Sequence, residues 1–387
     1  MSSPKTPGQD NHVGCLDGLR GLAATWVFLS HVQMLSGLQP LPVLAWGDLA
    51  VDLFMMISGF LMAHNYLTRS AREPWQAWST WRAFWVRRYF RIAPAYYLLL
   101  AVALIMGPML GSYRADIGEQ FPQTLTPTAR YLDDSVGNIM YHVTFLFGTL
   151  PEYAFRTPLP DWSIGLEMQF YALFPLLMLA IGPVFKLWRH ILVFAGALGV
   201  YLLVRRHASQ FEMPAFLPLK LHVFLLGIAL AFAKNGRGRL GPWAMVALIC
   251  AYALYKQPNV HGAGFALVAA GFGWLVSSQS QSGLLRRMRE VLSSAPGRLA
   301  GEYAYSFYLI HLLLLIPLAG FLVSNPWYLE LAPILRFALC AAGAGVGSFV
   351  LSGLLHRFVE QPGIQFGKRL LGGRSPAVPT GSIRRAG

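Results

Sequence analysis

The sequence predicts an all-α, polytopic membrane protein with about ten transmembrane helices and both termini in the cytoplasm. Two observations predict the fold class. Of the 387 residues, 55% are hydrophobic and only 12% are charged, and apolar runs of about 17 to 25 residues, the length that crosses a bilayer, recur along the chain. The positions of lysine and arginine predict the orientation, because these residues concentrate in cytoplasmic loops.

Charge and cysteine content exclude other classes of function. The net charge of +14 comes from lysines and arginines that lie between apolar runs. Membrane topology therefore explains the charge, and we expect no nucleic acid as a partner. The three cysteines are far apart, within or beside apolar segments, which predicts buried thiols and neither a disulfide framework nor a metal site.

A polar tail, residues 1–13, precedes the first of ten expected spans. The first apolar run carries Arg20 and lacks a small-residue cleavage site, so it is predicted to be a retained span and not a signal peptide. The spans are expected at roughly residues 14–36, 46–66, 91–109, 163–183, 191–204, 216–233, 241–255, 261–277, 303–323 and 332–356. One transmembrane domain, residues 14–362, is then followed by a basic cytoplasmic tail, residues 363–387, and we expect no soluble domain after it.

One further apolar segment, residues 138–150, has about 13 residues, which is short for a crossing and typical of a re-entrant or interfacial piece. If this segment does not cross and the N-terminus is cytoplasmic, 21 lysines and arginines lie inside and 6 outside. If it crosses, the numbers become 10 inside and 17 outside. The positive-inside rule therefore favours ten spans, with residues 111–161 as one long outer loop.

The first span carries two polar residues, Arg20 and His31, in the stretch LDGLRGLAATWVFLSH. Eleven residues make about three helical turns, so both side chains face the same way, roughly 16.5 Å apart along the axis. Asp17 precedes Arg20 by three residues and can pair with it. Polar groups in lipid are costly. Either Arg20 extends to the inner interface and His31 makes an interhelical hydrogen bond, or the two residues belong to a functional site.

The segment RRYFRIAP places Arg88 and Arg91 at the cytoplasmic start of the third span. Their i, i+3 spacing puts both on one face, and guanidinium groups suit the geometry of phosphate. The pair can clamp a phosphorylated ligand from the cytosol, or it can be a positive-inside anchor alone.

The second span contains Asp52 and Ser58 in GDLAVDLFMMISGF. Asp52 is too deep to stay unpaired, so it is expected to meet an arginine, a lysine or a polar cavity. Ser58 and the adjacent Gly59 favour close helix packing.

The fourth span begins with DWSIGLEMQFY and places Glu167 inside the membrane. This carboxylate can bind a sugar hydroxyl, orient His31 or pair with a cation such as Lys220. Interfacial pairing is the alternative without a catalytic role.

The last two spans contribute Tyr308 and His311, in YSFYLIH, and Glu360, in HRFVEQP. Each is by itself more typical of packing or hydrogen bonding than of catalysis. Together with the earlier polar residues they indicate a polar cavity lined by several helices.

In this order, the motifs resemble those of the integral-membrane acyltransferase family 3. The R-x10-H signature of that family is matched by Arg20 and His31, and its RxxR signature by Arg88 and Arg91. VDLFMMISGF lies between these two signatures, and DWSIGLEMQFY, YSFYLIH and VEQP follow them in the expected order. The resemblance therefore covers residues 16–362.

The resemblance implies a bacterial cytoplasmic (inner) membrane enzyme that moves an acyl group, usually acetyl from cytosolic acetyl-CoA, to a hydroxyl of a sugar-containing acceptor. The acceptor can be a surface polysaccharide, a glycolipid or a small glycosylated molecule. Acyl-CoA is a co-substrate, and no permanently bound cofactor is expected.

Under this interpretation Arg88 and Arg91 bind the coenzyme A phosphates, and Arg20 orients the pantetheine arm or stabilises the oxyanion. His31 acts as general base or, alternatively, accepts the acyl group as a covalent relay. Asp17, Asp52, Ser58, Tyr308, His311 and Glu360 have supporting roles. A polysaccharide or glycolipid transporter is the rival from another class, because buried charges also mark substrate pathways, but the sequence shows no paired halves.

Overall fold

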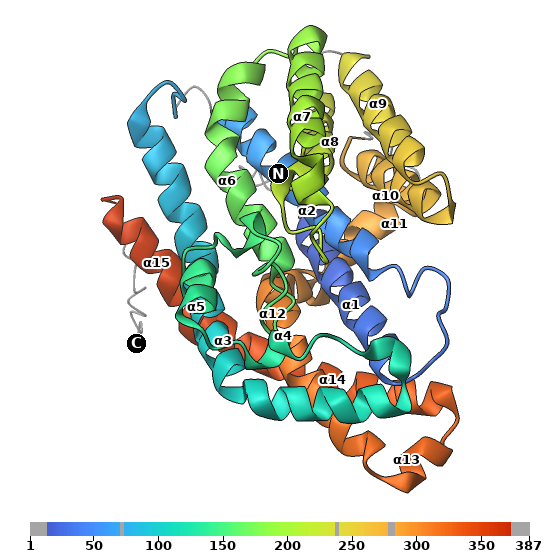
Figure 1. Ribbon diagram of the computed structural model, residues 1–387. Coiled ribbons are helices and arrows are strands. Elements are labelled where there is room, and N and C mark those ends of the chain that lie inside the picture. Colours follow the sequence, from blue (N-terminus) through green and yellow to red (C-terminus); the bar gives the residue numbers. More distant parts are fainter. Residues whose placement is uncertain (1–13, 70–72, 237–239, 278–282, 373–387) are drawn as a thin grey trace, which may run out of the picture.

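The computed structural model describes residues 14–69, 73–236, 240–277 and 283–372. Within these ranges all regular structure is helical and no strand occurs, which confirms the predicted fold class. Figure 1 shows the helices gathered into one bundle. The predicted N-terminal tail, residues 1–13, lies outside the described residues, and the predicted C-terminal tail begins inside the last helix, α15 (Gln361–Leu370).

A helix occupies each of the ten expected spans, and eight helices in the described part of the chain are long and apolar enough to cross a membrane. The protein is therefore a multi-pass membrane protein. Two of the ten helices are not among these eight: α9 has only 16 residues, and polar residues lower the hydropathy of α1. The ten helices are α1 (Cys15–Leu35), α2 (Gly47–Arg69), α3 (Trp78–Gln120), α6 (Trp162–Ile181), α7 (Leu187–Ala208), α8 (Leu217–Lys234), α9 (Gly241–Lys256), α10 (Val260–Ser277), α12 (Ala295–Val323) and α14 (Pro333–Leu355). The number of crossings and the cytoplasmic termini stay predictions.

The third span is much longer than predicted. Helix α3 has 43 residues, where the sequence indicated roughly 91–109. It contains Pro94 and Pro108, which remove backbone hydrogen bonds and bend a helix without having to end it. Figure 1 shows α3 running down one side of the bundle and then turning to lie across its lower end. The expected outer loop therefore starts about ten residues later, at Phe121.

The apolar segment 138–150 forms no helix that could cross a bilayer. It folds as α5 (Val136–Val143) and the short turn η3 (Phe147–Thr149). Eight residues of α-helix extend only about 12 Å, less than half of the hydrocarbon thickness. The prediction of a non-crossing segment is confirmed. Before it come η2 (Pro122–Thr124) and α4 (Ala129–Leu132).

Close helix contacts at glycines bring the polar residues of different spans together. A Cβ atom on Gly59 of α2 would lie 2.2 Å from the carbonyl oxygen of Phe224 in α8, and one on Gly301 of α12 would lie 2.1 Å from that of Asp17 in α1. Only glycine permits such approach of two backbones. Gly59 therefore has the packing role that the sequence predicted.

The C-terminal helices continue without a break. Helix α14 passes into a π-helical turn, η4 (His356–Glu360), and then into α15. Two short helices, α11 (Gly283–Leu292) and α13 (Pro326–Glu330), flank α12 in the sequence. The π-helical turn matters for the site because it holds Glu360, which is buried.

Candidate active site

A cavity of about 600 Å³ lies between α1, α2, α3, α6, α12 and the η4–α15 segment. We call it the arginine cavity. Eight of the eleven residues singled out in the sequence line it: Asp17, Arg20, Ser58, Arg88, Arg91, Glu167, Tyr308 and Glu360. The other three, His31, Asp52 and His311, do not. Six motifs that are distant in the sequence thus contribute to one site or to its immediate surroundings.

Arg20 of α1 and Arg88 and Arg91 of α3 converge in the arginine cavity, which Arg69 of α2 also lines. Arg20 is 3.9 Å from Asp17 on the preceding turn, as the spacing predicted. Arg91 is close enough to Arg20 and to Arg88 for their positive charges to repel one another. The Nε atom of Arg88 is buried and has no hydrogen-bond partner among the described residues. Repelling cations and an unused buried donor suit an anionic ligand.

Glu167 supplies negative charge to the same cavity. Its carboxylate accepts hydrogen bonds from Ser58 Oγ, at 2.8 Å, and from Tyr171, and it interacts favourably with the charges of Arg20 and Arg88. Its hydrogen bonds go to α2 and α6 and not to His31. Tyr171 had not been singled out, although it follows Glu167 by four residues and so shares its helix face.

Lys220 is the partner of Asp52 and not of Glu167. Its Nζ is 2.6 Å from the Asp52 carboxylate, and both side chains are largely buried. The expectation that Asp52 needs a cation is thus confirmed, whereas the possible Glu167–Lys220 pair is wrong. The choice depends on how α6 and α8 are rotated toward α2, which helical periodicity does not fix.

Glu360 projects from the π-helical turn toward α12. Its carboxylate accepts a hydrogen bond from Ser306, and it lies 3.2 Å from Nδ1 of His356. His356 also lines the arginine cavity and was not singled out, although an i, i+4 pair in HRFVEQP was a usable signal. The π-helical turn, a feature that is often found at functional sites, had no signal in the sequence.

His31 and His311 form a pair outside the arginine cavity. His31 Nδ1 lies 2.9 Å from the carbonyl oxygen of Val27 and 3.3 Å from His311 Nε2. His311 Nδ1 is 2.7 Å from the carbonyl oxygen of Tyr308. His311 is fully buried, while His31 is partly exposed.

Tyr308 connects the two parts of the site. It lines the arginine cavity, and it stands one turn before His311 on α12. Its hydroxyl donates to the carbonyl oxygen of Pro160, at 2.7 Å, so the Ser163 hydroxyl, at 2.8 Å, donates to Tyr308. Tyr308 thereby ties α12 to the start of α6 between the arginines and the histidines.

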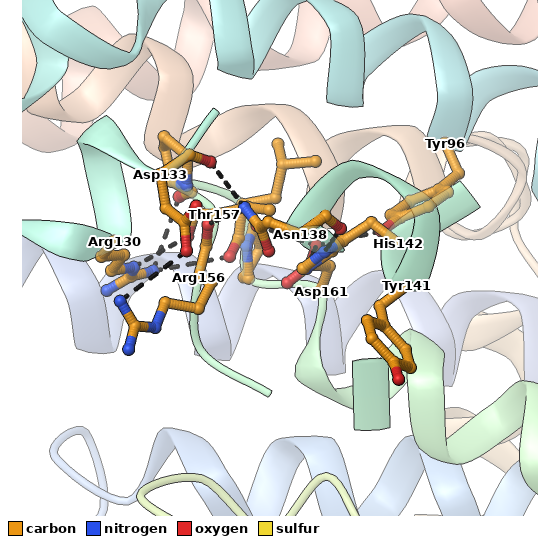
Figure 2. Close-up of polar contacts among 12 residues, drawn as sticks. Tyr96, Arg130, Asp133, Asn138, Tyr141, His142, Arg156, Thr157 and Asp161 are labelled. Carbon is orange, nitrogen blue, oxygen red and sulfur yellow. Dashed lines mark hydrogen bonds and ion pairs between the residues drawn. The ribbon is translucent and has the colours of Figure 1, made fainter. Parts of the chain in front are cut away.

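The loop before α6 is fixed by its own polar network (Figure 2). Arg130 Nε donates to the carbonyl oxygen of Thr157, at 2.9 Å. Asp161 accepts from Thr157 Oγ1, at 2.8 Å, and from Tyr96, at 3.2 Å. Burial raises the pKa of Asp161, although the nearby His142 and these hydrogen bonds act in the opposite direction. Asp161 of the DWSIGLE motif thus shapes the loop that carries Pro160.

His31 lies on the side of this loop. The charges of Arg114 and Arg130 act on it, whereas the charge of Arg91 acts on Arg20 at the other end of α1. Arg114 and Arg130 are residues of the expected outer side, and Arg88 and Arg91 of the expected inner side. Among the described residues no group of three or more His, Cys, Asp or Glu side chains is placed to hold a metal ion.

Comparison with known proteins identifies acyltransferases among the relatives of this chain. The sequence model of the family described as an acyltransferase domain matches residues 13–353. The acyltransferase MdmB of Streptomyces mycarofaciens is 27% identical over 395 residues, which cover 94% of this chain and 93% of that protein.

Two further relatives are longer proteins. The peptidoglycan O-acetyltransferase OatA of Listeria monocytogenes is 23% identical, and the O-acetyltransferase OatA of Staphylococcus aureus is 24% identical. The alignments cover 91% and 90% of this chain but 56% of each relative. This chain therefore spans little more than half the length of these two. No solved structure matches the chain.

Proposed function

The chain belongs to the integral-membrane acyltransferase family 3, and from this premise we propose that it moves an acyl group, acetyl in the simplest case, from cytosolic acyl-CoA to a hydroxyl of a sugar-containing acceptor. Family and fold make it a multi-pass membrane acyltransferase, and favour acyl transfer over transport. The donor, the acceptor and the bacterial cytoplasmic membrane as its location belong to the proposal.

The observation that supports the donor is the convergence of Arg20, Arg88 and Arg91 in one cavity. Phosphate groups of coenzyme A would lie between the guanidinium groups and offset their repulsion, and a phosphate oxygen would accept a hydrogen bond from the buried Arg88 Nε. Guanidinium groups bind phosphate through parallel, charge-assisted hydrogen bonds. Glu167, like Asp17 and Glu360, adds negative charge to the cavity, and it holds Ser58 and Tyr171 beside the arginines.

His31 is proposed to carry the chemistry at the other end of α1. Its Nε2 accepts the proton of the acceptor hydroxyl while the hydroxyl oxygen attacks the thioester carbonyl carbon. The carbon–sulfur bond then breaks, and the coenzyme A thiolate takes up the proton. The thioester reaches His31 past Tyr308, between α1 and α12, with the phosphates left among the arginines.

A covalent relay uses the same atom. In that sequence His31 Nε2 attacks the thioester carbonyl carbon, the carbon–sulfur bond breaks and the coenzyme A thiolate leaves. The acceptor hydroxyl oxygen then attacks the acyl carbon, the carbon–nitrogen bond breaks, and the hydroxyl proton passes to the freed Nε2 and from there to the thiolate or solvent. If labelled donor leaves its acyl group on the wild-type protein in the absence of acceptor, and not on His31→Ala, the result would favour the relay. Either order places the acceptor at the partly exposed side of His31, on the expected outer face.

The acceptor is proposed to be a glycan, a glycolipid or a small glycosylated molecule. Two of the relatives are named O-acetyltransferases, and one of these is named for peptidoglycan. A hydroxyl acceptor is consistent with His31 as a base, because a hydroxyl must lose its proton when it forms an ester.

The proposal is tested with membranes that contain the protein and with radiolabelled acetyl-CoA. We expect label in a glycan or lipid fraction with the wild type and none above background with His31→Ala. His261→Ala is the matched control, because it removes a partly exposed histidine of α10 that pairs with Asp48. Equal labelling by the wild type and His31→Ala would refute the proposed role.

A further inference from the structure

Of the two paired histidines, His31 has a role in the proposed reaction and His311 has none so far. His311 is fully buried, and its ring packs edge-on against Phe28 with centroids 6.1 Å apart. A side chain in this position cannot touch an acceptor. Its only route to the chemistry is through His31, whose ring centroid is 5.0 Å away.

The protonation of the His311 ring follows from its neighbours. Nδ1 lies 2.7 Å from the carbonyl oxygen of Tyr308. A carbonyl oxygen can only accept, so this nitrogen must carry the proton and donate it. In the neutral ring the other nitrogen, Nε2, then has a free lone pair, and this lone pair points at His31.

The same reasoning then fixes His31. Its Nδ1 faces two acceptors, the Val27 carbonyl oxygen at 2.9 Å and the lone pair of His311 Nε2 at 3.3 Å. A proton on Nδ1 satisfies both. The opposite tautomer would direct three lone pairs at one another, so neutral His31 carries its proton on Nδ1 and its lone pair on Nε2.

We infer that His311 is a positioning residue that, together with the carbonyl oxygen of Val27, holds His31 in the tautomer with a free Nε2 lone pair, and that it stabilises the imidazolium that forms when this nitrogen takes up a proton. The inference rests on the proposed function of His31. It applies to both reaction orders, because general base and nucleophile both need the lone pair on Nε2. His311 contributes as an acceptor for the Nδ1 proton and itself remains neutral.

Two substitutions separate this role from simple packing. In His311→Gln the longer side chain can place an amide oxygen where Nε2 was, so it retains an acceptor for His31. In His311→Asn the shorter side chain reaches only the position of Nδ1 and leaves His31 without this acceptor. Both variants remove the ring, so packing losses are similar.

Steady-state kinetics give the first readout. We expect kcat to fall about tenfold to a hundredfold in His311→Asn, the loss typical of one hydrogen bond to a group that becomes charged. We expect His311→Gln to stay within about threefold of the wild type, and the KM for acetyl-CoA to be unchanged in both, because the arginine cavity is intact. Equal losses in the two variants would reduce His311 to a packing residue.

The tautomer itself gives the second readout, which does not need acyl transfer. Protein labelled with ¹⁵N-histidine in lipid nanodiscs is compared with His31→Ala and His311→Asn to assign the two rings. We expect both rings of the wild type to carry a proton on Nδ1 and none on Nε2. In His311→Asn we expect a larger share of the His31 tautomer with its proton on Nε2, because only the carbonyl oxygen of Val27 then opposes it. A proton on Nε2 of either ring in the wild type, or an unchanged His31 in His311→Asn, would overturn the inference.

The two readouts keep this inference apart from the function itself. If the wild type and His31→Ala transfer label equally, the proposed function fails, yet the ¹⁵N shifts still decide the tautomer. If His311→Asn does not fold, the wild-type ring protonation and the activity of His311→Gln decide the matter.

Discussion

Arg20 and His31 stand three turns apart on the same face of α1 but meet different surroundings. Around Arg20 the neighbours are charged: Asp17, Arg91 and Glu167. His31 contacts a backbone carbonyl oxygen and the imidazole of His311, although the charges of Arg114 and Arg130 also act on it. The environment of Arg20 suits a ligand with several negative charges, and that of His31 suits the uptake and release of a single proton. The difference indicates that α1 separates donor binding from chemistry.

The largest effect is expected at the histidine end. His31→Ala should lower kcat by about 10²- to 10⁴-fold, the usual contribution of a general base, and leave acetyl-CoA binding unchanged. Rapid-mixing transfer assays and equilibrium binding of radiolabelled coenzyme A measure the two quantities separately. Loss of donor binding in this variant would contradict the separation of functions, because the His31 end of α1 would then also be needed to bind the donor.

The next largest effect is expected on the stability of the protein, at a buried ion pair that belongs to neither the Arg20 end nor the His31 end of α1. Lys220→Met leaves the buried Asp52 carboxylate without its cation, and breaking such a pair costs about 3 to 5 kcal/mol. Thermal unfolding in detergent should show the loss, and the double variant Asp52→Leu with Lys220→Met should recover most of it. The activity of the remaining folded protein should change little. A large fall in its kcat would place Asp52 in the reaction.

A smaller effect is expected at the arginine end. Arg88→Ala should weaken acetyl-CoA binding by about tenfold to a hundredfold, the value of one charge-assisted hydrogen bond or slightly more. The kcat at saturating donor should stay near that of the wild type. Arg286→Ala is the control, since this exposed arginine of α11 pairs with Glu290 and does not line the arginine cavity. Equal donor affinity in both variants would show that the coenzyme A phosphates do not bind in the arginine cavity.

The smallest effect is expected at Ser58. Ser58→Ala removes the 2.8 Å hydrogen bond to Glu167 but leaves the one from Tyr171. A hydrogen bond to a charged group contributes about 1.5 to 3 kcal/mol. Because the Tyr171 hydroxyl still holds Glu167, only part of this loss reaches the donor, so donor affinity should fall by about tenfold at most. Titration with coenzyme A measures this. A change in kcat with no change in donor affinity would show that Glu167 acts in the chemical step and not in donor binding.

Contacts within one helix were predictable from the sequence, because helix geometry fixes them. The spacing of Asp17 and Arg20 predicted their pairing, and the spacing of Arg88 and Arg91 predicted that both face the same cavity. The cost of a buried carboxylate predicted a cation beside Asp52. These inferences needed only helical periodicity and the energetics of charge in lipid.

Contacts between helices were not predictable in the same way. The partner of Glu167 depends on the rotation of α6 against α2, and the approach of His311 to His31 depends on how closely α12 packs on α1. The third span was expected at roughly residues 91–109, but α3 runs from Trp78 to Gln120 and continues through Pro94 and Pro108, because a bent helix tolerates proline. The π-helical turn that directs Glu360 inward also had no local signal.

The separation of donor binding from chemistry along α1 is tested most directly by a cryo-EM structure with a non-hydrolysable thioether analogue of acetyl-CoA. The account predicts the phosphates beside Arg88 and Arg91, with the acyl end next to Nε2 of His31. Density for the acyl end on the far side of Tyr308 from His31, with the phosphates away from these arginines, would contradict it.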